Sequence, residues 1–210
     1  MPRISNYVRI PAHPALLKHI VHYSISFPLQ GPILSGSLSL VPDASGSIVC
    51  TCLGGRIEQL LWGPSSRLVT VANDVNRIPL RLFVELRPGA LSPLFRGMSA
   101  DVLRDCVVPL ESIDQELSFA LGRTLERSFS IRPGNPSSSV QGRDLFCKVL
   151  ADELDALFLR RFANPETDKQ LLIRYITSKI AQSHGCLRAS EVARLTGYSE
   201  RYLHQLSSQS

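Results

Sequence analysis

LRASEVARLTGYSERYLHQLSSQS, residues 187–210, is the most informative stretch of the chain, because it predicts two short helices joined by a turn. The apolar residues before Thr196 gather mostly on one side of a first helix. Gly197 can take the left-handed conformation that stops a helix, and the Ser199 hydroxyl can cap the next one. We therefore expect a helix, a glycine turn and a second helix.

The second helix has two different faces. Its apolar residues are expected to point inward: Tyr202, Leu203 and Leu206. The polar residues at spacings of three and four on the other face are Arg201, His204, Gln205 and Ser208. This arrangement is typical of a helix-turn-helix, in which the second helix meets base edges of DNA. Two ordinary packed helices would give the same pattern, and that alternative stays open.

Residues 191–206, EVARLTGYSERYLHQL, closely resemble the first helix-turn-helix of AraC/XylS-type transcription regulators. The Val-Ala, Gly-Tyr-Ser and Tyr-Leu steps all match. Members of that family carry two such motifs in succession, whereas this chain ends inside the second helix of the first. The resemblance therefore implies a shortened regulator that binds DNA weakly. The chain also departs from the family at Gln205, where Arg is usual, and at Ser207, where Phe is usual.

The same resemblance implies which residues contact DNA. Arg201, His204 and Gln205 match positions where such regulators contact bases, and Ser199 matches a phosphate contact. Arg can pair with guanine and Gln with adenine. For His204 the alternative is a solvated surface residue without a role in binding.

Turn motifs in the first half of the chain carry a second resemblance, which covers about residues 14–115. The motifs are LVPD at 40–43, WGP at 62–64, VELRPGA at 84–90 and VVPLE at 107–111. They are similar to landmarks of a sensor domain that often precedes AraC-type DNA-binding motifs. This resemblance implies a β-rich, barrel-like (cupin-like) domain followed by helices. The chain differs after Asp43, where Ala44-Ser45-Gly46 replaces the usual Gly-Cys.

Short apolar runs separated by Gly and Pro predict a sheet over residues 34–86. A hairpin is expected between 47–53 and 56–62, because two glycines between them tolerate a tight turn. Strict alternation of residue types predicts another strand at 78–87, and Pro79 indicates that its beginning lies at a sheet edge.

The rest of the pattern is helical, so the fold class is α+β. A first helix is predicted at 14–23, and amphipathic helices at 113–128, 143–162 and 168–184. The residues expected to face inward in the last of these are Leu171, Leu172, Tyr175, Ile176 and Ile180. We expect residues 1–165 to form the sensor and dimerisation domain, and 166–210 the partial DNA-binding domain.

Positive charge is concentrated at the end of the chain. The formal net charge of the 210 residues is +5. Residues 169–210 hold six Lys or Arg against Glu191 and Glu200, which gives +4 there and +1 for the rest. A cationic end on a near-neutral body is typical of a module that approaches phosphates. A solvated basic face on ordinary helices is the alternative.

The five cysteines lack the spacing of a disulfide framework or a zinc site, so reduced thiols and no metal are expected. No stretch has the pattern of a secretion signal or a membrane span. The sequence therefore predicts a cytoplasmic protein that does not contact a membrane.

The sequence carries no recognisable catalytic signature. It lacks a Gly-x-Ser-x-Gly elbow, a phosphate loop and a dinucleotide glycine pattern, and its five histidines fall outside the β-rich stretch. We therefore expect no enzyme and no cofactor. Trp62 and Phe83 are candidate contacts for a small-molecule effector inside the sheet, with core packing as an equal alternative.

Together these features predict an effector-responsive DNA-binding transcription regulator. Its expected partners are double-stranded DNA, an unidentified small molecule and a second copy of the chain. The effector would have to bind one arrangement of the protein better than another for a signal to pass. Two alternatives stay open: an effector-binding or dimerisation protein that has lost DNA binding, and a small-molecule enzyme on a barrel scaffold.

Overall fold

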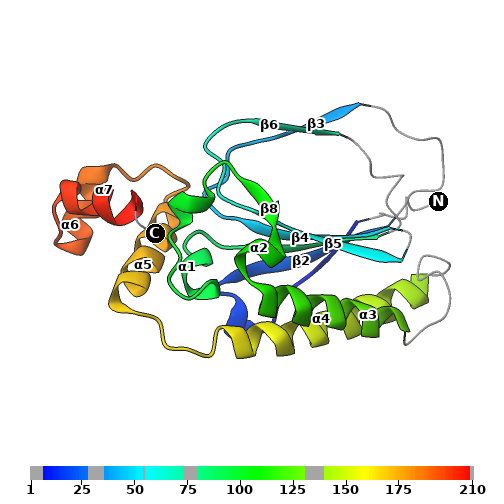
Figure 1. Ribbon diagram of the computed structural model, residues 1–210. Coiled ribbons are helices and arrows are strands. Elements are labelled where there is room, and N and C mark those ends of the chain that lie inside the picture. Colours follow the sequence, from blue (N-terminus) through cyan, green and yellow to red (C-terminus); the bar gives the residue numbers. More distant parts are fainter. Residues whose placement is uncertain (1–6, 28–35, 54, 73–79, 131–139, 209–210) are drawn as a thin grey trace.

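Two antiparallel β-sheets make up most of the first part of the protein (Figure 1). The computed structural model describes residues 7–27, 36–53, 55–72, 80–130 and 140–208. Six strands form one sheet in the order β1-β2-β7-β4-β5-β8, and β3 pairs with β6 in a second sheet. The strands are β1 (Tyr7–Ile10), β2 (Ile20–Ser26), β3 (Ser37–Leu40), β4 (Ser47–Leu53), β5 (Arg56–Trp62), β6 (Val69–Ala72), β7 (Leu80–Leu86) and β8 (Val107–Pro109).

The hairpin of β4 and β5 confirms the prediction made from the sequence. Leu53 pairs with Arg56 across the turn, and Gly55 has a φ of +77°, which glycine adopts without steric cost. Strand β7 also shows the predicted alternation, with every second residue from Leu80 to Leu86 buried. From Arg81 onward β7 pairs with β2 and β4 on its two sides, so this described part of the strand does not lie at a sheet edge. Pro79, which suggested the edge, lies outside the described residues.

The described strands do not close into a barrel. Strands β1 and β8 are the two edges of the larger sheet, and β3 and β6 pair with each other alone. Strand β8 spans three residues and ends in Pro109, which has no N–H group to extend a ladder. The β3–β6 pair lies over one face of the larger sheet (Figure 1). The α+β class with an antiparallel sheet is therefore confirmed, whereas barrel closure is not found.

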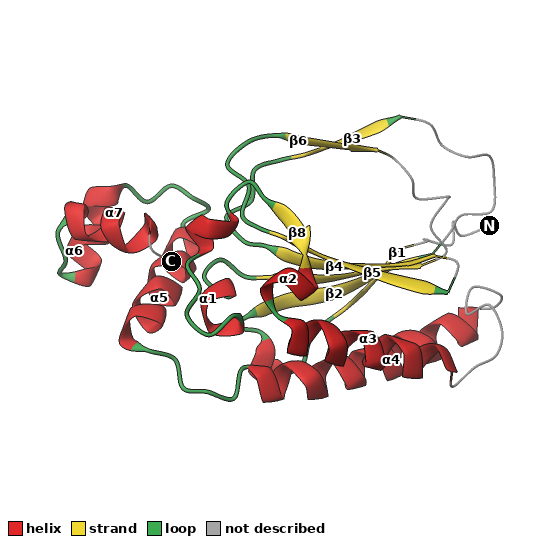
Figure 2. Cartoon of the chain, in the orientation of Figure 1, coloured by secondary structure: helices red, strands yellow, loops and turns green. Residues whose placement is uncertain are grey.

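Helices cover the opposite face of the larger sheet (Figure 2). The helical segments are η1 (Pro14–Leu16), α1 (Leu91–Leu94), η2 (Ala100–Leu103), α2 (Leu110–Ile113), α3 (Gln115–Ser130), α4 (Val140–Arg161), α5 (Asp168–Gln182), α6 (Ala189–Thr196) and α7 (Glu200–Ser208). The large apolar residues that α3 and α4 bury in the core are Leu117, Leu121, Leu125, Phe146, Leu150, Leu154, Leu157 and Phe158. Each such side chain stabilises the fold by about 1.5–3 kcal/mol. Within the described residues, no helix has the length and apolarity needed to cross a membrane.

The helix predicted at residues 14–23 is wrong. Residues 14–16 form a single 3₁₀ turn, and strand β2 already begins at Ile20. Ile20, Tyr23 and Ile25 are fully buried, and β2 is hydrogen-bonded to β1 on one side and β7 on the other. β-Branched and aromatic residues suit such a doubly paired strand, and this pairing decides the structure over local helical spacing.

Helices α5, α6 and α7 lie beyond one end of the sheet (Figure 1). Helix α5 begins with a capping box, in which Thr167 Oγ1 accepts from Gln170 N at 3.3 Å and Gln170 Oε1 accepts from Thr167 N at 2.9 Å. No residue of α5 is fully buried. Three residues predicted to face inward are exposed: Leu171, Tyr175 and Ile180. The prediction is wrong for them because α5 does not pack against the body along its whole length.

Candidate nucleic-acid interface

The junction of α6 and α7 is built from local hydrogen bonds that the sequence indicates. Helix α6 begins where Arg188 N donates to Glu191 Oε2 at 2.8 Å. It ends at Thr196 and is capped by Gly197, which has a φ of +73° and donates its N–H to Ala193 O at 2.9 Å. The Thr196 hydroxyl donates to Val192 O at 2.9 Å. The predicted positions of the helix end and of the left-handed glycine are therefore confirmed.

Ser199 caps helix α7 as predicted. Its Oγ accepts from Tyr202 N at 3.2 Å, and its carbonyl oxygen accepts from Leu203 N at 3.0 Å. Val192 in α6 and Leu206 in α7 are the buried residues of this two-helix corner. Two apolar anchors and a cap fix the direction of α7 relative to α6.

The predicted base-contacting residues of α7 all reach the surface. Arg201, His204 and Gln205 are exposed, while Leu206 on the opposite side is 4% exposed. Arg201 and Gln205 are four residues apart, so their side chains share one helix face. His204 differs from them because it also borders a cleft against the body. Ser199 is exposed; its Oγ accepts the cap hydrogen bond, and a hydroxyl in this position can still donate its O–H to a phosphate.

Tyr202 does not face inward, so that prediction is wrong. Its side chain is 42% exposed, and its ring stacks on Tyr198 with a centroid distance of 4.7 Å. Tyr198 lies in the turn just before the Ser199 cap and Tyr202 in the first turn of α7, so the stack joins the turn to the helix. Leu195 is also exposed, so the outer surface of the corner carries apolar as well as cationic side chains.

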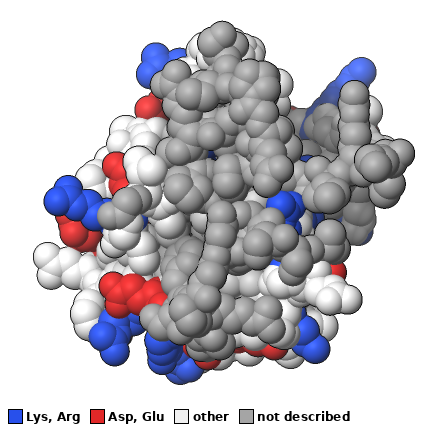
Figure 3. All heavy atoms as spheres, turned by 90° about the vertical axis from the view of Figure 1, so that its right-hand side faces the viewer, with Lys and Arg blue, Asp and Glu red and all other residues white. Residues whose placement is uncertain are grey.

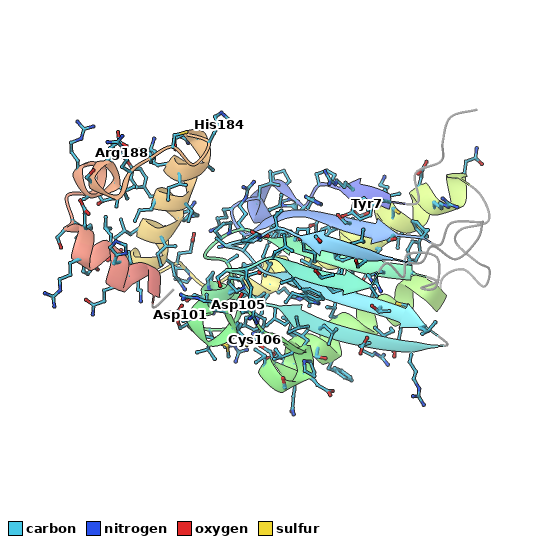
Figure 4. The ribbon with its side chains drawn as sticks, turned by 90° about the horizontal axis from the view of Figure 1, so that it is seen from above. Tyr7, Asp101, Asp105, Cys106, His184 and Arg188 are labelled. Carbon is cyan, nitrogen blue, oxygen red and sulfur yellow. The ribbon has the colours of Figure 1, made fainter. Side chains whose placement is uncertain are left out.

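Three arginines of this region are exposed and form no ion pair with any described residue: Arg188, Arg194 and Arg201. Figure 4 shows Arg188 on the side of the C-terminal helices away from Asp101. At the opposite end of the molecule, Lys and Arg side chains alternate with Asp and Glu around the described rim (Figure 3). Because Arg188, Arg194 and Arg201 are exposed and have no ion-pair partner among the described residues, they can bind an external anion.

A buried carboxylate joins α5 to the body. Glu166, with 7% of its side chain exposed, lies 2.9 Å from Lys18 Nζ and 3.1 Å from Arg174 Nε. Burial alone would raise the pKa of Glu166, but the Lys18 hydrogen bond and the charges of Lys18, Arg174 and His19 leave it below its usual value. Gln170 Nε2 donates to Ser92 Oγ at 3.4 Å beside this group. These polar contacts hold the first turns of α5 against the body.

His19 lies beside the same joint and is 3% exposed. Its ring stacks on Phe162 with a centroid distance of 4.1 Å. Burial lowers the pKa of His19 to about 4; Glu166 opposes this shift, whereas Lys18 and Arg174 add to it. His19 is therefore neutral near pH 7.

An open cleft of about 760 Å³ separates the body from the three C-terminal helices. Its body wall includes three prolines that follow or precede strands: Pro42, Pro64 and Pro88. Its helical wall is mainly aliphatic and comes from Ile173, Ile176, Ile180, Leu187, Val192, Leu203 and Leu206. Figure 4 shows Asp101 at the end of the body that faces these helices.

The sequence did not predict this cleft, although it contains a signal. The three prolines belong to the turn motifs Pro42-Asp43, Gly63-Pro64 and Pro88-Gly89. These turns are far apart in the chain, and strand pairing brings them to one end of the body. A side chain at position 63 would collide with Leu103 O, 1.8 Å from where its Cβ would lie, so glycine is required there.

Trp62 and Phe83, the predicted effector contacts, lie on one face of the larger sheet. Phe83 is opposite Val49 in β4, and Trp62 is opposite Ser47, two residues along the same strand. Both are half-buried, and neither lines the cleft. Trp62 Nε1 is buried without a hydrogen-bond partner among the described residues. Their role in ligand binding stays a prediction.

The described residues contain no group of three or more His, Cys, Asp or Glu side chains arranged to hold a metal ion. Comparisons of the chain with protein-family models, with curated proteins and with solved structures gave no match. The function is therefore inferred from the residues and their geometry.

Proposed function

We propose that this protein is an effector-responsive DNA-binding transcription regulator of the AraC type, in which the outer face of α7 enters a DNA groove. The observation that carries the proposal is the exposure of Arg201 and Gln205, four residues apart on the face of α7 opposite its buried Leu206. A major groove admits an α-helix, and these two side chains can pair bidentately with guanine and adenine. Their placement on early turns of the second helix suits a helix-turn-helix.

Cations around the corner support the same proposal. Arg188 precedes α6, Arg194 lies in its last turn and Arg201 lies in the first turn of α7. All three are exposed and unpaired among the described residues, so their charges remain available for phosphates. The first helix would cross the backbone while α7 contacts base edges.

The body is proposed to be a cupin-like sensor that dimerises in the cytoplasm. The antiparallel sheets and the helices that follow them support this assignment. The segment between Arg161, at the end of α4, and Asp168, at the start of α5, supports a boundary near residue 165. The unpartnered Trp62 Nε1 supports a ligand near Trp62 and Phe83.

Selection of duplexes from a random-sequence pool, followed by fluorescence anisotropy on the selected duplex, tests the proposal. Replacing Arg201 by Ala should cost about 1–3 kcal/mol, or roughly 5- to 150-fold in affinity, and relax a guanine preference. Arg56→Ala is the matched control, because Arg56 is an exposed arginine at the β4–β5 turn. Failure to enrich any duplex, or equal losses from both variants, would contradict the proposal.

A second candidate is an effector-binding or dimerisation protein that does not bind DNA. The exposed apolar side chains of Leu195, Tyr198 and Tyr202 favour it, because they offer a protein partner a contact surface at the same corner. Analytical ultracentrifugation of Tyr198→Ser separates the two candidates. Loss of self-association together with no duplex binding by the unmodified chain would favour this second function.

A further inference from the structure

The cleft between the body and the C-terminal helices has the properties of a small-molecule site. Its volume of about 760 Å³ lies within the range of roughly 300–1,000 Å³ that ligand pockets occupy. One wall consists of strand-end turns such as that of Ala44, and the other of aliphatic residues such as Ile176 and Leu203. A molecule that filled it would touch both parts of the protein at once.

The charged groups that line the cleft are mainly acidic. They comprise the carboxylates of Asp43, Asp101 and Glu200 and the guanidinium of Arg104. Arg104 is paired with Asp101, three residues before it, so its charge is already matched. The remaining carboxylates, Asp43 on the body and Glu200 on α7, border the cleft from its two sides.

The negative charge of Asp43 also acts on Glu85 at this end of the body. Burial raises the pKa of Glu85, and the charge of Asp43 raises it further, while Arg9 only partly opposes these effects. The Asp43 carboxylate itself accepts from Ser45 N at 2.9 Å and from Ser45 Oγ at 2.7 Å, which fixes its position. A fixed negative charge next to an apolar wall selects a ligand that carries a positive charge.

We propose that the cleft binds a small molecule with a compact apolar body and a protonated amine, which lies between Asp43 and Glu200. The apolar body fills the space between the proline turns and the aliphatic residues of α5 and α7. The site is distinct from the sheet face that carries Trp62 and Phe83, since neither residue lines the cleft.

Occupancy of the cleft would control α7, and this consequence rests on the proposed function. Among the described residues, the polar contacts that hold α5 to the body lie near its first turns, at Gln170 and, through Glu166, at Arg174. His204 borders the cleft and is also a predicted base contact. A ligand that joins both walls therefore holds α7 against the body and lowers its affinity for DNA.

Three compounds with one apolar cage and different charges test the site in the absence of DNA. Isothermal titration calorimetry compares 1-aminoadamantane, 1-adamantanol and adamantane-1-carboxylate on the full chain. We expect the amine to bind about tenfold more tightly than the carboxylate. Ala44→Phe fills the cleft from an exposed turn and should abolish binding. Glu200→Gln should remove most of the preference for the amine, while Phe119→Leu, at an exposed position of α3 outside the cleft, should leave binding unchanged.

No heat of binding for any of the three at about 10 mM would overturn the site. So would equal affinities for the three compounds, or loss of binding in Phe119→Leu but not in Ala44→Phe. Unfolding midpoints of the variants within a few degrees of the unmodified chain show that they fold. Fluorescence anisotropy with the selected duplex then tests whether the ligand controls DNA binding. A weaker complex with DNA at saturating amine supports this control, and an unchanged affinity for DNA overturns it. Absence of duplex binding without amine is instead a failure of the proposed function, which the calorimetric result does not depend on.

Discussion

Glu166 Oε1 lies 3.1 Å from Arg174 Nε, and the same carboxylate lies 2.9 Å from Lys18 Nζ. Lys18 belongs to the segment between η1 and β2, whereas Arg174 belongs to α5. One side chain therefore links the body to the first of the C-terminal helices. Because 93% of the Glu166 side chain is removed from solvent, its charge acts in a medium that screens it less than water does.

Removing this link should loosen α5 without unfolding the body. For Glu166→Ala we expect faster amide hydrogen exchange in residues 168–208, unchanged exchange in the sheet, and a loss of about 1 kcal/mol of stability. The loss stays modest because Lys18 and Arg174 are about 40% exposed and can be solvated. Glu153→Ala, which removes the exposed pair with Arg127, is the control. Equal exchange in α5 before and after the Glu166 change would show that this carboxylate does not hold the helix.

His19 should make the protein less stable as the pH falls. Its pKa is about 4 in the folded state against 6.5 unfolded, so the unfolded chain binds more protons between these values. The stabilising contribution is complete above about pH 6.5 and is lost as the pH falls toward 4. Urea unfolding should show a loss of about 2 kcal/mol from this group between about pH 7 and about pH 4.5.

The His19→Phe variant isolates that contribution, because a phenyl ring can still stack on Phe162 but cannot be protonated. Its stability should fall less than that of the unmodified chain over the same pH range. Parallel pH profiles for the two proteins would rule out His19 as the source.

Glu166 acts at lower pH: its pKa is below the usual value, so its contribution to stability is lost as the pH falls below about 4.5.

Gly197 should be sensitive to substitution for a purely backbone reason. An added Cβ would meet no atom within 4 Å, but the φ of +73° is unfavourable for L-residues with a side chain. Gly197→Ala should therefore destabilise the corner by about 1 kcal/mol, which would make amide hydrogen exchange in α7 roughly fivefold faster. Gly197→Asn should cost less, because asparagine adopts this conformation more readily. Equal effects of Ala and Asn would point to something other than backbone strain.

Tyr23 should stabilise the packing of α4 on the sheet through one hydrogen bond. Its buried Oη donates to Asp155 Oδ1 at 2.9 Å, and burial next to that carboxylate raises the pKa of Tyr23. Tyr23→Phe should lower the free energy of unfolding by about 1–2 kcal/mol. Tyr175→Phe changes an exposed tyrosine and should have little effect. A Tyr23 variant as stable as the Tyr175 variant would show that the bond contributes nothing.

Local patterns predicted the elements whose structure depends on local interactions. The β4–β5 hairpin followed from two glycines between apolar runs. The C-terminal end of α6 followed from Gly197, and the start of α7 followed from Ser199. The helix expected at residues 14–23 failed because the pairing of β2 with β1 and β7 is not visible in local spacing. The edge position expected near Pro79 lies outside the described residues and stays a prediction, whereas the described part of β7 pairs on both sides.

The candidate site divides in the same way. Exposure of Arg201 and Gln205 could be predicted, because their spacing sets them on the face opposite Leu206. The exposure of Tyr202 could not be predicted, because helical spacing favours its burial and gives no sign that its ring stacks on Tyr198 instead. The cleft could not be predicted at all, because its body wall joins turns from Pro42 to Pro88 that meet through strand pairing alone.

The central claim is that α6 and α7 present unpaired cations to DNA, and the salt dependence of duplex binding tests it most directly. Three arginines, Arg188, Arg194 and Arg201, would each displace counterions from the phosphates. For a mixed-sequence duplex, the logarithm of the association constant should fall against the logarithm of salt concentration with a slope of about −3. Arg194→Gln should reduce that slope by about one, and Arg56→Gln should leave it unchanged. Absence of binding at about 50 mM salt, or a slope that neither variant alters, would contradict the claim.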